Sequence, residues 1–153
     1  MAMNTPDTVY VTYIATTPEK VWAALTIGEI THKYFFGRRI ECDWKTGSTI
    51  NFWQEDGTLD VTGTILKAEE NRLLEYTWHV EWIEELRALP SCIITFRIEQ
   101  LGPVVRLTMI ESHPEPIDEK YLEGGRRGWP AILSGLKSLL ETGKPLPAFD
   151  PMK

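Results

Sequence analysis

The feature that most constrains the fold is a series of segments in which apolar and polar residues alternate, followed by one stretch with helical spacing. Residues 73–82 are the clearest case, with aromatic and aliphatic side chains on one face and Glu75, Thr77, His79 and Glu81 on the other. Residues 129–140 instead carry apolar side chains three or four positions apart. Because an alternating strand buries one face only, the pattern predicts an antiparallel sheet covered by a C-terminal helix.

Seven segments are predicted to be strands, and most of them are joined by short turns. Their ranges are 9–16, 38–44, 49–54, 59–68, 73–82, 92–100 and 104–113. Both faces of the first strand carry apolar residues, so its inner face stays unassigned. Thr17 as N-cap and Pro18 at the first position predict a helix that ends at Gly28, and residues 29–34 predict a second short one. Residues 83–90 are interpreted as a polar connection.

The C-terminal helix contains residues that normally weaken helices, namely Gly124, Gly125, Gly128 and Pro130. We expect a helical turn at 118–123, a bend across 124–128, and a straight helix to about 141. Pro130 would then lie in the first turn, and Gly135 at the edge of the polar face. The apolar stripe consists of Trp129, Ile132, Leu133, Leu136, Leu139 and Leu140. The hypothesis is a hinged lid over the sheet.

Length and charge set broad limits on function. With 153 residues and a net charge of −6, the chain is expected to form one domain over 8–146, with flexible termini at 1–7 and 147–153. An acidic chain is a poor binder of nucleic-acid backbones. The pairs Arg38-Arg39 and Arg126-Arg127 are interpreted as solvated surface pairs. The N-terminus lacks a signal-peptide pattern and no apolar run is long enough to span a membrane, so we expect a cytoplasmic protein.

The cysteine and tryptophan residues add two expectations. Cys42 and Cys92 lie far apart without a CxxC pattern, which argues against a disulfide framework or zinc site and favours buried free thiols. Six tryptophans are many for this length, and they fit either an aromatic core or an aromatic-lined pocket.

Five segments in register resemble a known superfamily: "TTPEKVWAALT", "CDWKTGSTINF", "VTGTILKAEENRLLEYTW", "CIITFRIE" with "VRLTMIESH", and "GWPAILSGLKSLLETG". Over residues 8–146 the chain resembles the START-like (SRPBCC, helix-grip) superfamily, in the branch similar to the C-terminal domain of the activator of heat shock protein 90 ATPase. The resemblance implies an α+β helix-grip fold. A curved antiparallel sheet of six or seven strands, with two short helices after the first strand, would grip a long C-terminal helix. It also implies an apolar cavity between sheet and helix.

The residues give no sign of catalytic or metal chemistry. His32, His79 and His113 lack metal-ligand spacing, no phosphate-binding loop is present, and no cofactor is expected. Glu111 and His113 share a face near the end of the last strand, where relatives often carry histidine at the position of Glu111. A buried Glu111 would need a partner such as His113 or Arg126, unless the strand frays and both groups reach water. The hypothesis is that Glu111 fixes the polar end of a ligand.

Three functions are open. The first is binding of an apolar or aromatic small molecule, the second a stress or chaperone cofactor that binds another protein, and the third a cyclase- or hydrolase-type enzyme that uses Glu111 and His113. Trp78 fits either core packing or the cavity wall. The residues expected to line the cavity are Ile50, Phe52, Tyr76, Trp78, Trp82, Phe96, Leu107, Met109, Glu111, His113, Trp129, Leu133 and Leu136.

Overall fold

A computed structural model describes residues 5–153 of the chain. Seven strands form one antiparallel sheet in the order β1-β7-β6-β5-β4-β3-β2, which confirms the predicted sheet. The strands are β1 (Thr8–Ile14), β2 (Arg39–Glu41), β3 (Thr49–Trp53), β4 (Leu59–Glu69), β5 (Leu73–Val80), β6 (Cys92–Leu101) and β7 (Val104–Ser112). The helices are α1 (Pro18–Thr26), α2 (Gly28–Tyr34), α3 (Glu84–Arg87), the 3₁₀ turn η1 (Glu119–Tyr121) and α4 (Glu123–Thr142).

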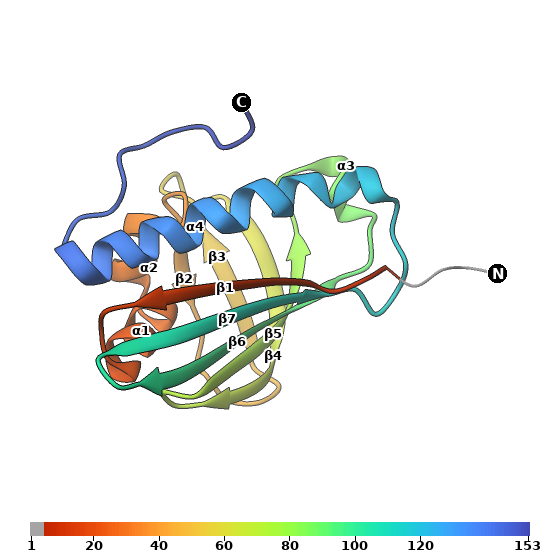
Figure 1. Ribbon diagram of the computed structural model, residues 1–153. Coiled ribbons are helices and arrows are strands. Elements are labelled where there is room, and N and C mark those ends of the chain that lie inside the picture. The colour runs from red at the N-terminus through yellow and green to blue at the C-terminus, as the bar shows by residue number, and fades with distance from the viewer. Residues whose placement is uncertain (1–4) are drawn as a thin grey trace.

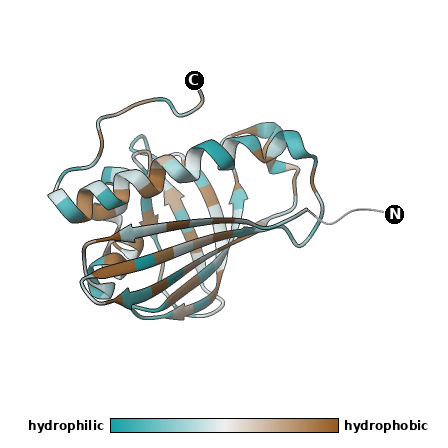
Figure 2. Cartoon of the chain, viewed as in Figure 1, coloured by the Kyte–Doolittle hydropathy of each residue, from teal (hydrophilic) through white to brown (hydrophobic). Residues whose placement is uncertain are grey.

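The sheet curves around α4, which lies across its open side (Figure 1). From β2 to β7 each strand pairs with the next along the chain, and β1 joins the far edge beside β7. Hydrophobic segments are distributed along the strands beneath α4, as hydropathy colouring shows (Figure 2). The inner residues of the central strands, among them Tyr76, Phe96 and Met109, are almost completely buried in one core with α4.

The helices after β1 begin and end for local reasons. The Thr17 hydroxyl accepts a hydrogen bond from the Lys20 amide at 3.4 Å, and Pro18 occupies the first turn, as predicted. After α2, Phe36 and Gly37 adopt positive φ angles of 54° and 76°. This turn delays β2 to Arg39 and leaves Arg38 outside the strand, although the sequence predicted a strand from residue 38.

The predicted bend before the C-terminal helix is wrong. Helix α4 runs without interruption from Glu123 to Thr142, so the three glycines and Pro130 all lie inside it. Its first turn is closed by a hydrogen bond from the Arg126 amide to the Leu122 carbonyl at 3.1 Å, and Leu122 is buried. Tertiary packing therefore overrides the low helix propensity of glycine. Pro130 is exposed, so the Arg126 carbonyl that lacks its helical donor can be hydrated.

The position predicted for Gly135 is also wrong. Gly135 is buried rather than at the edge of the polar face, and a Cβ atom there would lie 3.4 Å from the Cβ of Tyr34. The missing side chain lets α4 approach α2 closely. The polar connection at 83–90 likewise contains a short helix, α3, which the sequence did not predict.

The two ends of the chain differ from the core. Of the N-terminal segment expected to be flexible, residues 1–4 lie outside the described residues. At the other end, residues 144–153 lack a helix or strand and return along α4 (Figure 1). The flexibility of both termini stays a prediction. Within residues 5–153, no helix is both long and apolar enough to cross a membrane.

Candidate functional site

A pocket of about 510 Å³ lies at one end of the molecule, between the N-terminal half of α4, the end of β5, the connection that holds α3, and the end of β7. The connection contributes an apolar wall of Ile83, Leu86, Leu89 and Pro90, and α4 contributes Trp129 and Ile132. A few buried polar groups interrupt these walls. Small-molecule sites usually combine these two features.

Glu111 is the buried carboxylate of the pocket. It lies on β7 and its side chain is 10% exposed, so the strand has not frayed here. The Trp129 indole Nε1–H donates to Glu111 Oε1 at 3.0 Å, and His113 Nε2 lies 3.1 Å from Glu111 Oε2. An ionised carboxylate only accepts hydrogen bonds, so this contact is a hydrogen bond in the tautomer of His113 that carries a proton on Nε2. In neutral His113 the other ring nitrogen, Nδ1, is then an acceptor.

Helix α4 reaches this carboxylate through Gly125. A Cβ atom at Gly125 would lie 2.9 Å from Glu111 Oε1, closer than such contacts normally come. The Tyr10 hydroxyl donates to the Gly125 carbonyl from the other side at 3.4 Å. Burial, followed by the charge of Glu111, raises the pKa of Tyr10. A glycine at this position therefore allows the helix, β1 and the carboxylate to meet.

Arg38 is the second buried charge of the pocket. Its Nε donates to Asp60 Oδ2 at 2.9 Å, and the two side chains are 10% and 2% exposed. The Gln54 amide donates to the other oxygen of Asp60. Burial lowers the pKa of the Arg38 guanidinium, while the hydrogen bond and charge of Asp60 act in the opposite direction. Arg38 is therefore a paired interior cation, and its interpretation as part of a solvated pair is wrong.

Aromatic rings surround the Arg38 guanidinium. Its central carbon lies 4.7 Å from the ring centre of Trp82 and 5.8 Å from that of Trp78. The rings of Phe35 and Phe36 lie at 5.8 and 5.9 Å. Cation–π attraction at these distances favours a charged guanidinium in an apolar setting.

His79 connects the α3 segment to β5. Its Nδ1 lies 2.9 Å from Glu81 Oε1, and its Nε2 lies 3.0 Å from the Arg87 carbonyl oxygen. Both partners are acceptors, so both contacts are hydrogen bonds only when both ring nitrogens carry protons. His79 thus links the α3 segment to β5 through its contact with the Arg87 carbonyl oxygen.

Cys92 also lines the pocket, opposite Trp78 in the β5–β6 pairing. Cys92 is a buried free thiol, as predicted, whereas Cys42 is free but only half-buried; burial together with the charge of Glu111 raises the pKa of Cys92. The thiol is therefore protonated and a weak nucleophile at neutral pH. Within residues 5–153, no group of three His, Cys, Asp or Glu side chains could hold a metal ion.

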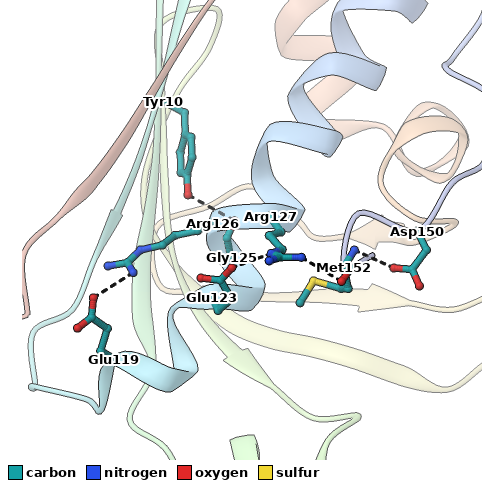
Figure 3. Close-up of polar contacts among 8 residues, drawn as sticks. All are labelled: Tyr10, Glu119, Glu123, Gly125, Arg126, Arg127, Asp150 and Met152. Atoms are coloured by element: carbon teal, nitrogen blue, oxygen red, sulfur yellow. Dashed lines mark hydrogen bonds and ion pairs between the residues drawn. The ribbon is translucent and has the colours of Figure 1, made fainter.

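The C-terminal segment closes one side of the pocket with Pro151 and Met152. Arg127 on α4 holds it: its Nε contacts Glu123 at 2.7 Å and its Nη1 donates to the Met152 carbonyl at 3.0 Å (Figure 3). Arg126 points the other way, toward Glu119 at 3.2 Å (Figure 3). Arg126 is therefore paired with Glu119, and Arg127 with Glu123.

The structure divides the predicted cavity residues into two groups. Those that line the pocket are Trp78, Trp82, Glu111, His113 and Trp129. Those that pack in the core and do not line the pocket are Ile50, Phe52, Tyr76, Phe96, Leu107, Met109, Leu133 and Leu136. The second group fills the space between the sheet and the middle of α4, where aliphatic side chains of α4 meet the inner face of the sheet. The pocket of about 510 Å³ therefore lies at the end where α4 carries Gly124, Gly125 and Gly128.

Sequence reasoning missed Arg38, Asp60 and the wall from the α3 segment. The paired Arg38-Arg39 resembles a surface motif, and its burial depends on the turn at Phe36 and Gly37. The apolar residues Ile83, Leu86 and Leu89 have helical spacing within the polar connection and were the available signal for α3.

A family model described as Activator of Hsp90 ATPase homolog 1-like protein matches residues 15–141. Among curated proteins, no sequence matches the chain.

Solved structures that share this fold include protein SSP2350 from Staphylococcus saprophyticus, with a TM-score of 0.74 and 25% identity over 94% of this chain and 98% of that one. The Aha1 dimer from Colwellia psychrerythraea gives a TM-score of 0.69 and 22% identity, covering 92% of this chain and 99% of that one. CalU16 from Micromonospora echinospora gives 0.71 and 21%, covering 92% and 77%. At identities this low, the last two similarities show a common fold alone.

Proposed function

We propose that this chain, which belongs to the Activator of Hsp90 ATPase homolog 1-like protein family, binds an apolar or aromatic small molecule in the pocket beside α4. The main observation that supports this proposal is the pocket itself. Its volume of about 510 Å³ falls within the range of small-molecule sites, roughly 300–1,000 Å³. Its walls are mainly aromatic and aliphatic, and Glu111, His113 and Arg38 supply polar groups that could orient a ligand.

The test places a larger side chain of α4 inside the pocket. Gly128 lines the pocket, and a Cβ atom there would have only an ordinary contact with Phe36 at 3.9 Å. We expect Gly128→Leu to fold and to weaken binding of the neutral fluorophore N-phenylnaphthylamine at least tenfold. The matched control is Ser134→Leu on the same helix, because Ser134 is exposed and outside the pocket. Equal binding by the wild type, Gly128→Leu and Ser134→Leu would contradict the proposal.

Family membership favours a second candidate, a chaperone cofactor that activates an Hsp90 ATPase. In this case the relevant surface would contact a protein, and filling the pocket would have no effect on it. The test is the ATPase rate of purified Hsp90 with and without the protein. A stimulation that Gly128→Leu preserves would favour this candidate, and an unchanged rate would count against it.

The contact between Glu111 and His113 favours a third candidate, an enzyme. In the form of His113 that donates from Nε2 to Glu111 and has no proton on Nδ1, Nδ1 is an acceptor; since His113 lines the pocket, it could take a proton from a bound substrate. Turnover in a substrate screen that disappears in His113→Gln, while ligand binding persists, would support this function. Turnover that His113→Gln retains would exclude this mechanism.

A further inference from the structure

The pocket has one arginine and no lysine among its lining residues within 5–153. This arginine is Arg38, and only 8% of its surface is exposed. A guanidinium carries five N–H donors. At so buried a position, each donor needs an acceptor from the protein, from water or from a ligand.

The hydrogen bonds of Arg38 leave most of these donors unused. Its Nε–H binds Asp60, and neither Nη atom has an acceptor among the described residues. The Nη atoms are also not sealed from solvent, because within residues 5–153 the fully enclosed side-chain polar atoms that lack a partner are Thr16 Oγ1 and His32 Nδ1. Arg38 lines the pocket, so a ligand bound there lies beside the side chain that carries these donors.

The rings around Arg38 limit what can approach these donors. Trp82, Trp78, Phe35 and Phe36 place their ring centres within 5.9 Å of the guanidinium carbon. Trp78 also packs against Trp129, with ring centres 5.1 Å apart. A ligand atom that accepts from Nη must therefore be attached to a body that packs well against aromatic rings.

The charges near the pocket decide what kind of acceptor fits. Asp60 already neutralises Arg38. Glu111 adds a second buried carboxylate, whose partners are His113 and the neutral indole of Trp129. An anionic ligand would add a further buried negative charge, which is costly without a new cation. An uncharged oxygen satisfies the Nη donors without that cost.

We infer that the ligand is an aromatic molecule with an uncharged carbonyl oxygen, and that Arg38 Nη groups donate hydrogen bonds to this oxygen. The inference rests on the proposed function, since it requires a ligand in the pocket. It identifies Arg38 as the residue that selects ligands with a carbonyl group over hydrocarbons of the same shape. A site built to donate hydrogen bonds discriminates strongly against an analogue that lacks the acceptor.

The test uses three naphthalene probes of similar size. N-phenylnaphthylamine has no oxygen, prodan carries an uncharged propionyl carbonyl, and anilinonaphthalene sulfonate carries an anion. We expect Arg38→Lys, which keeps the charge beside Asp60, to weaken prodan binding at least tenfold and to change N-phenylnaphthylamine binding less than threefold. Bound prodan should emit at longer wavelength in the wild type than in the variant, because hydrogen bonds to its carbonyl shift the emission to the red.

A second variant guards against misfolding. The double variant Arg38→Met with Asp60→Asn removes both charges together, so no unpaired carboxylate remains buried. It should retain N-phenylnaphthylamine binding and lose the preference for prodan. Prodan binding that is unchanged in both variants would overturn the inference, as would an Arg38-dependent preference for the sulfonate. If none of the probes binds the wild type, the proposed function fails, and the inference fails with it.

Discussion

Glu111 is a residue whose substitution tests the polar end of the pocket directly. One carboxylate oxygen accepts a hydrogen bond from the Trp129 indole, and the other lies within hydrogen-bond distance of His113 Nε2. Glutamine can accept through one oxygen only, and its amide group would face the other donor. We expect Glu111→Gln to lower the free energy of unfolding by about 1–3 kcal/mol, measured by urea denaturation. The exposed Glu115→Gln should change it by less than about 0.5 kcal/mol, and equal effects would contradict this role.

Two adjacent glycines of α4 predict opposite effects of the same substitution. A Cβ atom at Gly124 would meet nothing within 4 Å, whereas at Gly125 it would meet Glu111 Oε1 at 2.9 Å. Gly124→Ala should raise the free energy of unfolding by up to about 1 kcal/mol through helix propensity. Gly125→Ala should lower it by roughly 1–3 kcal/mol, because the carboxylate must move and its hydrogen bonds weaken. Thermal denaturation of the two variants distinguishes these outcomes, and stabilisation by both would contradict the close approach.

At the scale of single residues, the sequence predicted only part of the site. Strand periodicity placed Glu111 and His113 on one inward face, because residues two apart on a strand point the same way. It could not show that Trp129 would supply the second donor, since that contact depends on how α4 crosses the sheet. Arg38 was missed because the turn that buries it has no periodicity to reveal it.

At the scale of elements, Pro130 tests the uninterrupted course of α4. Proline inside a helix removes one backbone hydrogen bond and costs up to about 3 kcal/mol relative to alanine. Pro130 is exposed, so an alanine there meets no obstacle. We expect Pro130→Ala to raise the free energy of unfolding by roughly 1–3 kcal/mol. Pro145→Ala, beyond the end of the helix, should gain nothing, and a loss of stability in Pro130→Ala would contradict this description of the helix.

The contacts of His79 predict how firmly the α3 segment covers the pocket. None of the residues of α3 is buried, and His79 links the segment to β5 through the Arg87 carbonyl. We expect His79→Ala to increase amide hydrogen exchange at Leu86, Arg87 and Leu89 several-fold, with little change in the central strands. His32→Ala, at a different site, should leave exchange in residues 83–90 unchanged. Equal protection in both variants would show that the segment is held by other contacts.

The helices show why elements were easier to predict than their ends. The apolar spacing from Trp129 to Leu140 correctly predicted the buried face of α4, because burial follows the helical period. Its beginning was misplaced because local propensity favoured a bend at the glycines. The close approach of α4 to Glu111 at Gly125 is a long-range feature that local propensity does not reveal.

At the scale of the whole molecule, the antiparallel sheet, the helix-grip fold and the family were predicted from sequence and are confirmed, whereas the strand order, with β1 beside β7, was not predicted. Alternation, turn residues and a single amphipathic helix leave few other ways to bury the apolar faces. The extent of the pocket was beyond such reasoning. Periodicity shows which side chains point inward, and it does not show whether they fill the interior, as Phe52 and Leu136 do, or leave space, as at Gly124 and Gly128.

For the folded molecule as a whole, we also predict a loss of stability at alkaline pH. The side chains of Tyr34, Tyr76 and Cys92 are buried, and burial is the main cause that raises the pKa of each. The folded state therefore keeps these protons, whereas the unfolded chain releases them above about pH 8.5 for cysteine and 10 for tyrosine. Because the unfolded state then binds fewer protons, the free energy of unfolding falls as pH rises.

The size of this effect makes it measurable. Each buried group costs about 1.4 kcal/mol per pH unit above its unfolded pKa, so the three together remove roughly 6 kcal/mol by pH 11. Since domains are stabilised by about 5–15 kcal/mol, we expect cooperative unfolding between about pH 10 and 12. Circular dichroism and tyrosinate absorbance should change together, and Cys92→Ser should gain about 3 kcal/mol relative to the wild type between pH 7 and pH 10.5. Complete ionisation of Tyr34 and Tyr76 without loss of circular dichroism would contradict their burial, because a folded core that admits two phenolates cannot be closed to solvent.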